Sequence, residues 1–154
     1  MDAVIAPRLP AWMGEHAKRY LASGGKDGHL YETTDPGHPT LIVPSLLLTA
    51  TGRKSGRRYV FPLFYGRTGE SYFVIAGGSA GPLDHPGWYK NLLAHPEAEI
   101  MVGTEKLKVR ARTATAAERG ALWQQAVVFW PPYDDYQKKA ADREIPVVVL
   151  DPVS

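Results

Sequence analysis

The sequence contains no cysteine among its 154 residues. This absence excludes disulfide bonds, thiol nucleophiles, thiolate metal sites and iron–sulfur clusters held by cysteine. The five histidines are scattered along the chain without a pair at helical ligand spacing, so we predict no metal site. The motif Gly-x-Ser-x-Gly is also missing, and the sequence therefore gives no support for hydrolysis by a Ser-His-Asp triad.

Long apolar runs and a large excess of charge are missing as well. The longest apolar stretch, LIVPSLLL at 41–48, is interrupted by Pro44 and Ser45 and is far too short to cross a bilayer. The first 20 residues lack the cationic head and continuous apolar run of a signal peptide. The formal net charge is only +2, which disfavours nucleic-acid binding through bulk charge. We therefore predict a soluble, cytoplasmic protein that binds no nucleic acid.

The composition is that of one globular domain, with 44% hydrophobic and 22% charged residues. Within it, residues 1–39 are expected to form a helix and a turn-rich connector that pack on residues 40–154. A helix over 9–22 is predicted because apolar and aromatic side chains recur there at helical spacing, at Trp12, Met13, His16, Tyr20 and Leu21. This helix either lies on the core or forms an amphipathic flap that touches a lipid-like substrate or a membrane surface.

The rest of the chain is predicted to be mainly β. About six short β-rich runs occur, at 40–50, 57–66, 71–77, 98–103, 106–115 and 145–151. Glycine-containing turns separate several of them, which predicts antiparallel hairpins. Helices are expected at 85–96, 115–130 and 133–142, the second opening with Thr115 and Glu118 at capping-box spacing. The predicted fold is α+β, a small barrel of about six antiparallel strands with helices packed outside.

The segment TGRKSGRR at 51–58 carries most of the local positive charge, with four cations in six positions around Ser55. One interpretation is a hairpin tip whose cations are simply solvated. The other is an anion clamp, in which glycines let backbone N–H groups approach the anion while arginine and lysine add charge-assisted hydrogen bonds. The glycine spacing is not that of a Walker phosphate loop.

Two further groups of residues suggest a binding site. Glycines between 77 and 81 would expose a run of backbone amides, and Trp88 and Asn91 lie one turn apart on the helix that follows. These residues either form a loop with Trp88 in the core, or bind a flat heterocycle that Trp88 lines. The aromatic group Phe129, Trp130, Tyr133 and Tyr136 is either core packing or a pocket wall.

Taken in order, LLLTATGRKSGRR, HPGWYKNLLAHPEAEI, ARTATAAERGALW, YDDYQ and IPVVVLDP resemble the deazaflavin-dependent nitroreductase family of actinobacteria. The resemblance covers roughly residues 40–152. It implies a split β-barrel, similar to that of FMN-binding reductases, that binds coenzyme F420. The implied coenzyme-binding residues are Arg53, Lys54, Ser55, Arg57, Arg58, Gly77, Gly78, Ser79, Ala80, Gly81, Trp88 and Asn91. The cations would hold the anionic phosphodiester and oligoglutamate tail, and the glycines and Trp88 would hold the ring.

The activity implied by the resemblance is hydride transfer from the reduced coenzyme (F420H2) to an electrophilic, apolar acceptor: a quinone, an activated enone or a nitro compound. Trp12, Trp130, Tyr133 and Tyr136 would form the acceptor pocket. Tyr133, Tyr136 or water would supply the proton. Family members commonly have an arginine where this chain has Tyr59, and a Ser-Lys pair where it has Gly78 and Ser79. Since Trp130 also replaces a tyrosine of the nitroimidazole-activating enzyme, nitroimidazole activation is not assumed.

Two other functions remain open at this point. The same barrel could bind FMN or haem, with the basic segment meeting a single phosphate or propionates. Alternatively, the protein could be a non-catalytic module that binds an acidic partner or single-stranded nucleic acid through residues 53–58. The sequence leaves the oligomeric state undetermined.

Overall fold

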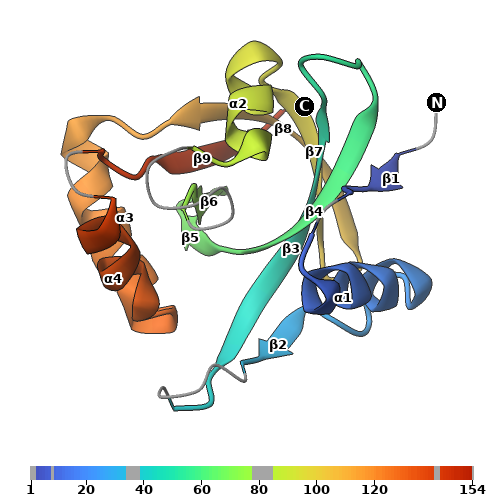
Figure 1. The fold of residues 1–154 in the computed structure, drawn as a ribbon, viewed down its shortest axis with the longest axis horizontal. Coiled ribbons are helices and arrows are strands. Elements are labelled where there is room, and N and C mark those ends of the chain that lie inside the picture. Colours follow the sequence, from blue (N-terminus) through green and yellow to red (C-terminus); the bar gives the residue numbers. More distant parts are fainter. Residues whose placement is uncertain (1–2, 8, 34–38, 78–84, 141–142, 154) are drawn as a thin grey trace.

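A computed structural model describes residues 3–7, 9–33, 39–77, 85–140 and 143–153. Within these ranges the chain forms nine strands and four helices (Figure 1). The prediction of a mainly β, α+β protein is confirmed, whereas the expected number of about six strands was too low.

Eight strands form one continuous order, β1-β4-β3-β7-β8-β9-β6-β5, and β2 pairs with β3 beside this path. All neighbouring strands are antiparallel except β1 and β4, so the predicted hairpins are confirmed. The strand bounds are β1 (Val4–Ile5), β2 (Leu30–Glu32), β3 (Ile42–Thr51), β4 (Arg58–Phe64), β5 (Gly66–Thr68), β6 (Ser71–Ile75), β7 (Glu97–Val102), β8 (Glu105–Thr113) and β9 (Val147–Pro152).

The strands that sequence reasoning missed or merged are the three shortest. β1, β2 and β5 contain two or three residues each, too few to show an alternating pattern. Each exists because a longer neighbour pairs with it, β4, β3 and β6 respectively. β2 lies inside the segment expected to be a connector. β5 begins at the last residue of the run expected at 57–66 and continues into the expected turn.

The longer strands follow their sequence patterns closely. β3 is buried at most of its positions, as expected for a continuous apolar run. β8 alternates, with Val109 and Ala111 buried and the intervening Lys108, Arg110 and Arg112 exposed. This alternation gives β8 one solvent-exposed face, as predicted.

The helices are α1 (Ala11–Ala22), α2 (Gly87–Ala94), α3 (Ala116–Phe129) and α4 (Pro132–Lys139). The predicted capping box is confirmed: the Thr115 side chain accepts from the Glu118 N–H, and the Glu118 carboxylate accepts from the Thr115 N–H. In Figure 1, α1 lies on one side of the sheet, α3 and α4 lie on the other, and α2 lies between them near one end. No helix in the described part of the chain is both long enough and apolar enough to span a membrane.

The main core lies inside the curvature of the sheet. It joins Leu46 and Leu48 of β3 to Val74 of β6, although three strands separate β3 from β6 in the sheet order. Trp88 of α2 packs into the same core. A second core lies between the sheet and α3 and α4, and includes Trp123. The sheet must therefore curl, because residues from distant strands meet on its inner side.

Tyr20 fixes α1 to the sheet. Its side chain is fully buried, and its single O–H is shared between the carbonyls of Ser45 (2.9 Å) and Met101 (3.1 Å). The same oxygen accepts from the Gly103 N–H at 2.7 Å. Burial raises the pKa of Tyr20 to about 12, so the phenol stays protonated. These three hydrogen bonds hold one wall of the cavity described next.

Candidate active site

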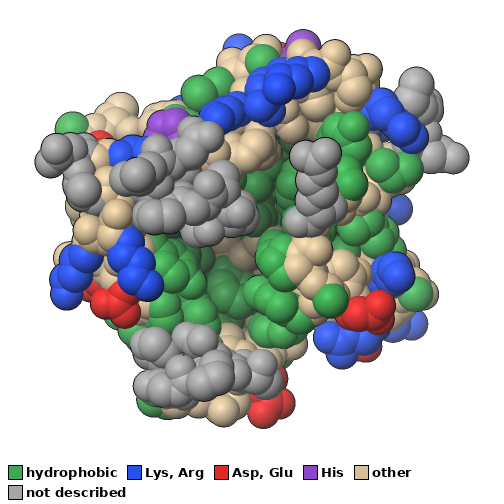
Figure 2. Space-filling model, in the orientation of Figure 1, with side chains coloured by type: hydrophobic (Ala, Val, Ile, Leu, Met, Phe, Trp, Pro, Cys, Tyr) green, Lys and Arg blue, Asp and Glu red, His purple; other side chains and the backbone are tan. Residues whose placement is uncertain are grey.

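A cavity of about 470 Å³ opens between α1, α2, β4 and the α3–α4 side of the molecule. Figure 2 shows this hollow, lined mainly by hydrophobic side chains. Its volume is in the range typical of small-molecule sites. The cavity brings together six of the residues predicted for the site: Trp12, Gly77, Trp88, Trp130, Tyr133 and Tyr136.

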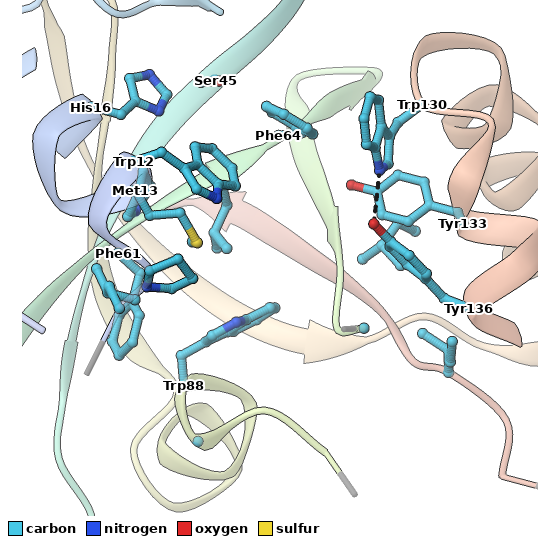
Figure 3. Close-up of a pocket in the computed structure, with 18 of the residues that line it drawn as sticks. Trp12, Met13, His16, Ser45, Phe61, Phe64, Trp88, Trp130, Tyr133 and Tyr136 are labelled. Carbon is cyan, nitrogen blue, oxygen red and sulfur yellow. Dashed lines mark hydrogen bonds between the residues drawn. The ribbon is translucent and has the colours of Figure 1, made fainter. Parts of the chain in front are cut away.

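The wall formed by α1 is mostly apolar. Trp12 and Met13 point toward the cavity from the first turn of α1, and His16 lies one turn further on (Figure 3). Trp12 is 49% exposed, so it lies at the rim. Trp88 of α2 is nearly buried and contributes both to the main core and to the cavity. Both interpretations offered for Trp88 from the sequence therefore apply at once.

The opposite wall comes from the end of α3 and from α4. Figure 3 shows Trp130, Tyr133 and Tyr136 facing α1 across the cavity. Asp134 and Asp135 in the first turn of α4 and two lysines in its last turn match the helix dipole. The Trp123 indole N–H donates to Asp134 Oδ1 at 2.8 Å, which fastens α4 to α3.

The two tyrosines of this wall have different surroundings. The Tyr136 hydroxyl accepts from the Trp130 indole N–H at 3.3 Å, the hydrogen bond drawn in Figure 3. Tyr133 is buried and lines the cavity. Burial, assisted by the neighbouring Tyr136, raises the pKa of Tyr133 well above its usual range. Tyr133 is therefore a hydrogen-bond donor that does not readily release its proton.

The basic segment lies in the β3–β4 hairpin and reaches α2 through Arg53. Asn91 Oδ1 accepts from the Arg53 backbone N–H at 3.1 Å and from its Nη1 at 2.8 Å. Arg53 Nη1 also donates to the Gly87 carbonyl at 3.3 Å, and Gly87 lines the cavity. Asn91 is buried and supports the hairpin. Arg53 is thus fixed beside one edge of the cavity.

The remaining residues of the hairpin differ in orientation. Lys54 and Arg57 are exposed. Ser55 stabilises the turn, because its hydroxyl accepts from the Arg57 N–H at 3.1 Å. Arg58 instead pairs with Glu99 of β7 at 3.0 Å. The structure therefore does not bring Arg58 together with Arg53 at the α2 edge.

Four of the residues implied by the resemblance, Gly78, Ser79, Ala80 and Gly81, lie outside the described residues. Gly77 is described and lines the cavity. A Cβ added to Gly77 would meet Ile145 at 3.4 Å and Tyr136 at 3.8 Å, so a side chain would take up space beside the cavity. In the described ranges no group of three or more metal-ligating side chains occurs.

Sequence reasoning missed several residues of the cavity, including His16, Ser45 and residues 61–64 of β4. The β4 residues gave no local signal, since any buried strand would show the same pattern. Ser45 did give a local sequence signal, because it places a hydroxyl within a run of buried aliphatic residues.

Comparison with known proteins agrees with this geometry. The family model described as "F420H(2)-dependent quinone reductase" matches residues 12–152. An F420H(2)-dependent quinone reductase of Mycobacterium tuberculosis is 36% identical over 138 residues, which cover 88% of this chain and 86% of that protein. A second M. tuberculosis protein, a putative F420H(2)-dependent quinone reductase, is 36% identical over 110 residues, covering 71% of this chain and 91% of that protein.

A solved structure of an F420-H2 dependent reductase, FDR-A, superposes with a TM-score of 0.63 at 37% identity, covering 70% of this chain and 94% of that chain. The family predicted from the ordered motifs, one of reductases that depend on F420, is confirmed. The chain belongs to the F420H(2)-dependent quinone reductase family.

Proposed function

We propose that this protein is an oxidoreductase that uses reduced coenzyme F420 to reduce quinones. Family membership supports the cofactor and the acceptor class. The observation that best supports the proposal is that a cationic hairpin adjoins an aromatic cavity. The hydrogen bonds of Arg53 to Asn91 and Gly87 place a cationic hairpin against an aromatic cavity.

The residues present fit this coenzyme. Its phosphodiester and glutamate tail are anionic, and Arg53, Lys54 and Arg57 lie exposed on the hairpin. Its tricyclic ring is flat, and a ring face can pack against the apolar cavity wall at Trp88. The lack of a side chain at Gly77 leaves room for close approach of the ring. We assign the tail to the hairpin and the ring to the Trp88 and Gly77 edge.

The bound coenzyme supplies the hydride, and the protein supplies position and a proton. Trp12 and Trp130 exclude water from the cavity on opposite sides. Tyr133 donates a hydrogen bond to an acceptor oxygen and stays protonated. We assign the proton transfer to Tyr136, because its hydroxyl oxygen accepts from the Trp130 N–H and its own O–H is left to donate.

We also infer that the curled sheet is a split β-barrel. The support is the main core, in which residues of β3 and β6 meet although β7, β8 and β9 lie between them in the sheet order. In the described residues β1 and β5 at the two ends of this order do not pair, so the barrel is open.

The direct test is to mix enzyme, F420H2 and menadione without oxygen and to follow the return of absorbance of the oxidised coenzyme. We expect enzyme-dependent oxidation with menadione and with other quinones. Titration with F420 and with FMN, followed by the quenching of tryptophan fluorescence, should show tighter binding of F420. No enzyme-dependent oxidation across several quinones would contradict the proposal, and preferential binding of FMN would favour the flavin alternative.

A further inference from the structure

Ser45 occupies an unusual position in the middle of β3. Its side chain is fully buried, and Oγ has no hydrogen-bond partner among the described residues. Its backbone is fully used, since the N–H donates to the His29 carbonyl at 2.7 Å and the carbonyl accepts from Tyr20. Buried hydroxyls are normally hydrogen-bonded, and leaving one without a partner lowers stability. The hydroxyl therefore points to a role outside the folding of the chain.

Ser45 also contributes to the cavity lining, at its α1 end. The surrounding lining is apolar, with Met13, Phe61 and Phe64 nearby in the same cavity (Figure 3). A serine side chain has a single rotatable bond to its oxygen, so the hydroxyl can turn toward a ligand at little entropic cost. Ser45 can thus present a hydroxyl donor among the apolar side chains of this part of the lining.

His16 adds a hydrogen-bond acceptor at the α1 end of the cavity. Its Nε2 lies 2.7 Å from the Gly28 carbonyl, and since a carbonyl can only accept, Nε2 carries a hydrogen. Burial is the main cause that lowers the pKa of His16, so at neutral pH the ring is neutral and Nδ1 is an acceptor. Gly28 and His29 are consecutive, and their carbonyls bind His16 and the Ser45 N–H respectively. Both residues also line the same cavity, on the side where α1 lies (Figure 3).

We propose that Ser45 and His16 form a polar anchor for one oxygen of the acceptor, at the end of the cavity opposite Tyr133 and Tyr136. This inference rests on the proposed quinone reductase function and defines the acceptor further. A para-quinone has an oxygen at each end, so one molecule can meet both polar ends of the cavity. The Ser45 hydroxyl donates to the carbonyl of the quinone, and His16 Nδ1 accepts from the hydroxyl of the hydroquinone product.

The anchor can be tested by binding, without turnover. The dissociation constants of menadione and of menadiol are measured by anaerobic calorimetry, with the oxidised coenzyme present. Ser45→Ala should weaken menadione binding about threefold to tenfold, as expected for one neutral hydrogen bond. Coenzyme binding should not change. The melting temperature should stay the same or rise. Ser45→Thr, which keeps a hydroxyl, should restore much of the affinity.

His16→Gln tests the hydrogen-bond acceptor Nδ1. The glutamine amide N–H can replace the Nε2 hydrogen, while Nδ1 is removed. It should weaken menadiol binding about threefold or more and menadione binding less. Ser71→Ala, which removes a hydroxyl that bonds Asp151 outside the cavity, is the control and should change neither constant.

Two results would overturn the anchor. One is an unchanged menadione constant in folded Ser45→Ala. The other is a marked fall in melting temperature for that variant, which would show that the hydroxyl has a partner within the protein. A wild-type protein that binds menadione through Ser45 but does not oxidise F420H2 would contradict the proposed function and leave the anchor standing.

Discussion

The cationic hairpin and the aromatic cavity are built in opposite ways. The hairpin is one continuous, exposed segment whose charges lie within six positions. The cavity is assembled from α1, β3, β4, α2 and α4, segments that are far apart in the chain. The hairpin can be recognised without knowledge of the fold, whereas the cavity exists only after folding. They meet at Arg53, whose Nη1 donates to Asn91 of α2 and to the carbonyl of Gly87, a residue of the cavity lining.

The comparison also separates two kinds of binding energy. Charges on an exposed loop act through attraction that salt screens, and they determine which anions bind. Buried aromatic walls act through shape and exclusion of water, and they determine where the reacting atoms lie. We therefore expect substitutions in the hairpin to change coenzyme affinity, and substitutions in the cavity to change turnover or acceptor affinity.

The largest effect is expected for Tyr136→Phe. If Tyr136 donates the proton, its loss should lower kcat by about 100-fold, the lower range for general acid catalysis. Tyr133→Phe is the matched control on the same helix. It should raise KM about threefold to tenfold through the loss of one hydrogen bond and leave kcat nearly unchanged. Steady-state kinetics with menadione measure both constants. Normal turnover by Tyr136→Phe would remove its proton-donor role.

The second effect concerns the hairpin. The double variant Arg53→Ala/Lys54→Ala should raise the dissociation constant of F420 about tenfold or more, since two charge-assisted hydrogen bonds are lost. The Arg53 N–H still reaches Asn91, so the loop should keep its position. Fluorescence titration at two salt concentrations measures the change and its screening.

Two variants serve as controls for the hairpin. Lys106→Ala/Lys108→Ala removes the same charge from the exposed face of β8. Arg58→Ala removes a hairpin cation that pairs with Glu99. Both should leave the dissociation constant within about twofold. An equal rise for the β8 variant would show that net charge, and not the hairpin, governs binding.

The smallest effect lies outside both regions and concerns pH. Arg112 bonds Glu118 and Asp151, and its guanidinium lowers the pKa of Glu118 to about 2. Because this pKa is depressed on folding, its contribution to stability is present above about pH 4.5 and is lost as pH falls toward 2.

The test is urea unfolding between pH 7 and pH 2.5. Wild type should lose more stability over this range than Glu118→Gln, in which the capping box is kept and the charge is removed. Coenzyme affinity at pH 7 should be the same in both proteins. Identical pH profiles would mean that the ion pair does not contribute to stability.

Most of the fold followed from local patterns. The long strands, the capping box at Thr115 and the start of α2 after Pro86 each depend on interactions within a few residues. β1, β2 and β5 could not be predicted, because two or three residues become a strand only when a neighbour offers its free edge. The curl of the sheet likewise depends on contacts between distant strands.

The candidate site divides in the same way. Trp12 and Trp130 were assigned to the pocket through the family resemblance, and Trp88 was a candidate from its spacing with Asn91. The structure places all three around one cavity. Arg58 was grouped with its neighbours by sequence alone, and its pairing with Glu99 depends on the register of β3 with β4 and β7. His16 and Ser45 line one cavity only after folding, when consecutive carbonyls bind one residue from α1 and one from β3.

The bonds from Asn91 to Arg53 have one more consequence. They tie the hairpin to α2, so the distance between the base of the hairpin at Arg53 and the aromatic cavity is set by the protein. A coenzyme that binds at both points therefore spans a fixed distance. Glutamates of the coenzyme tail beyond that distance would extend into solvent. They would change neither the position of the ring nor the rate of hydride transfer.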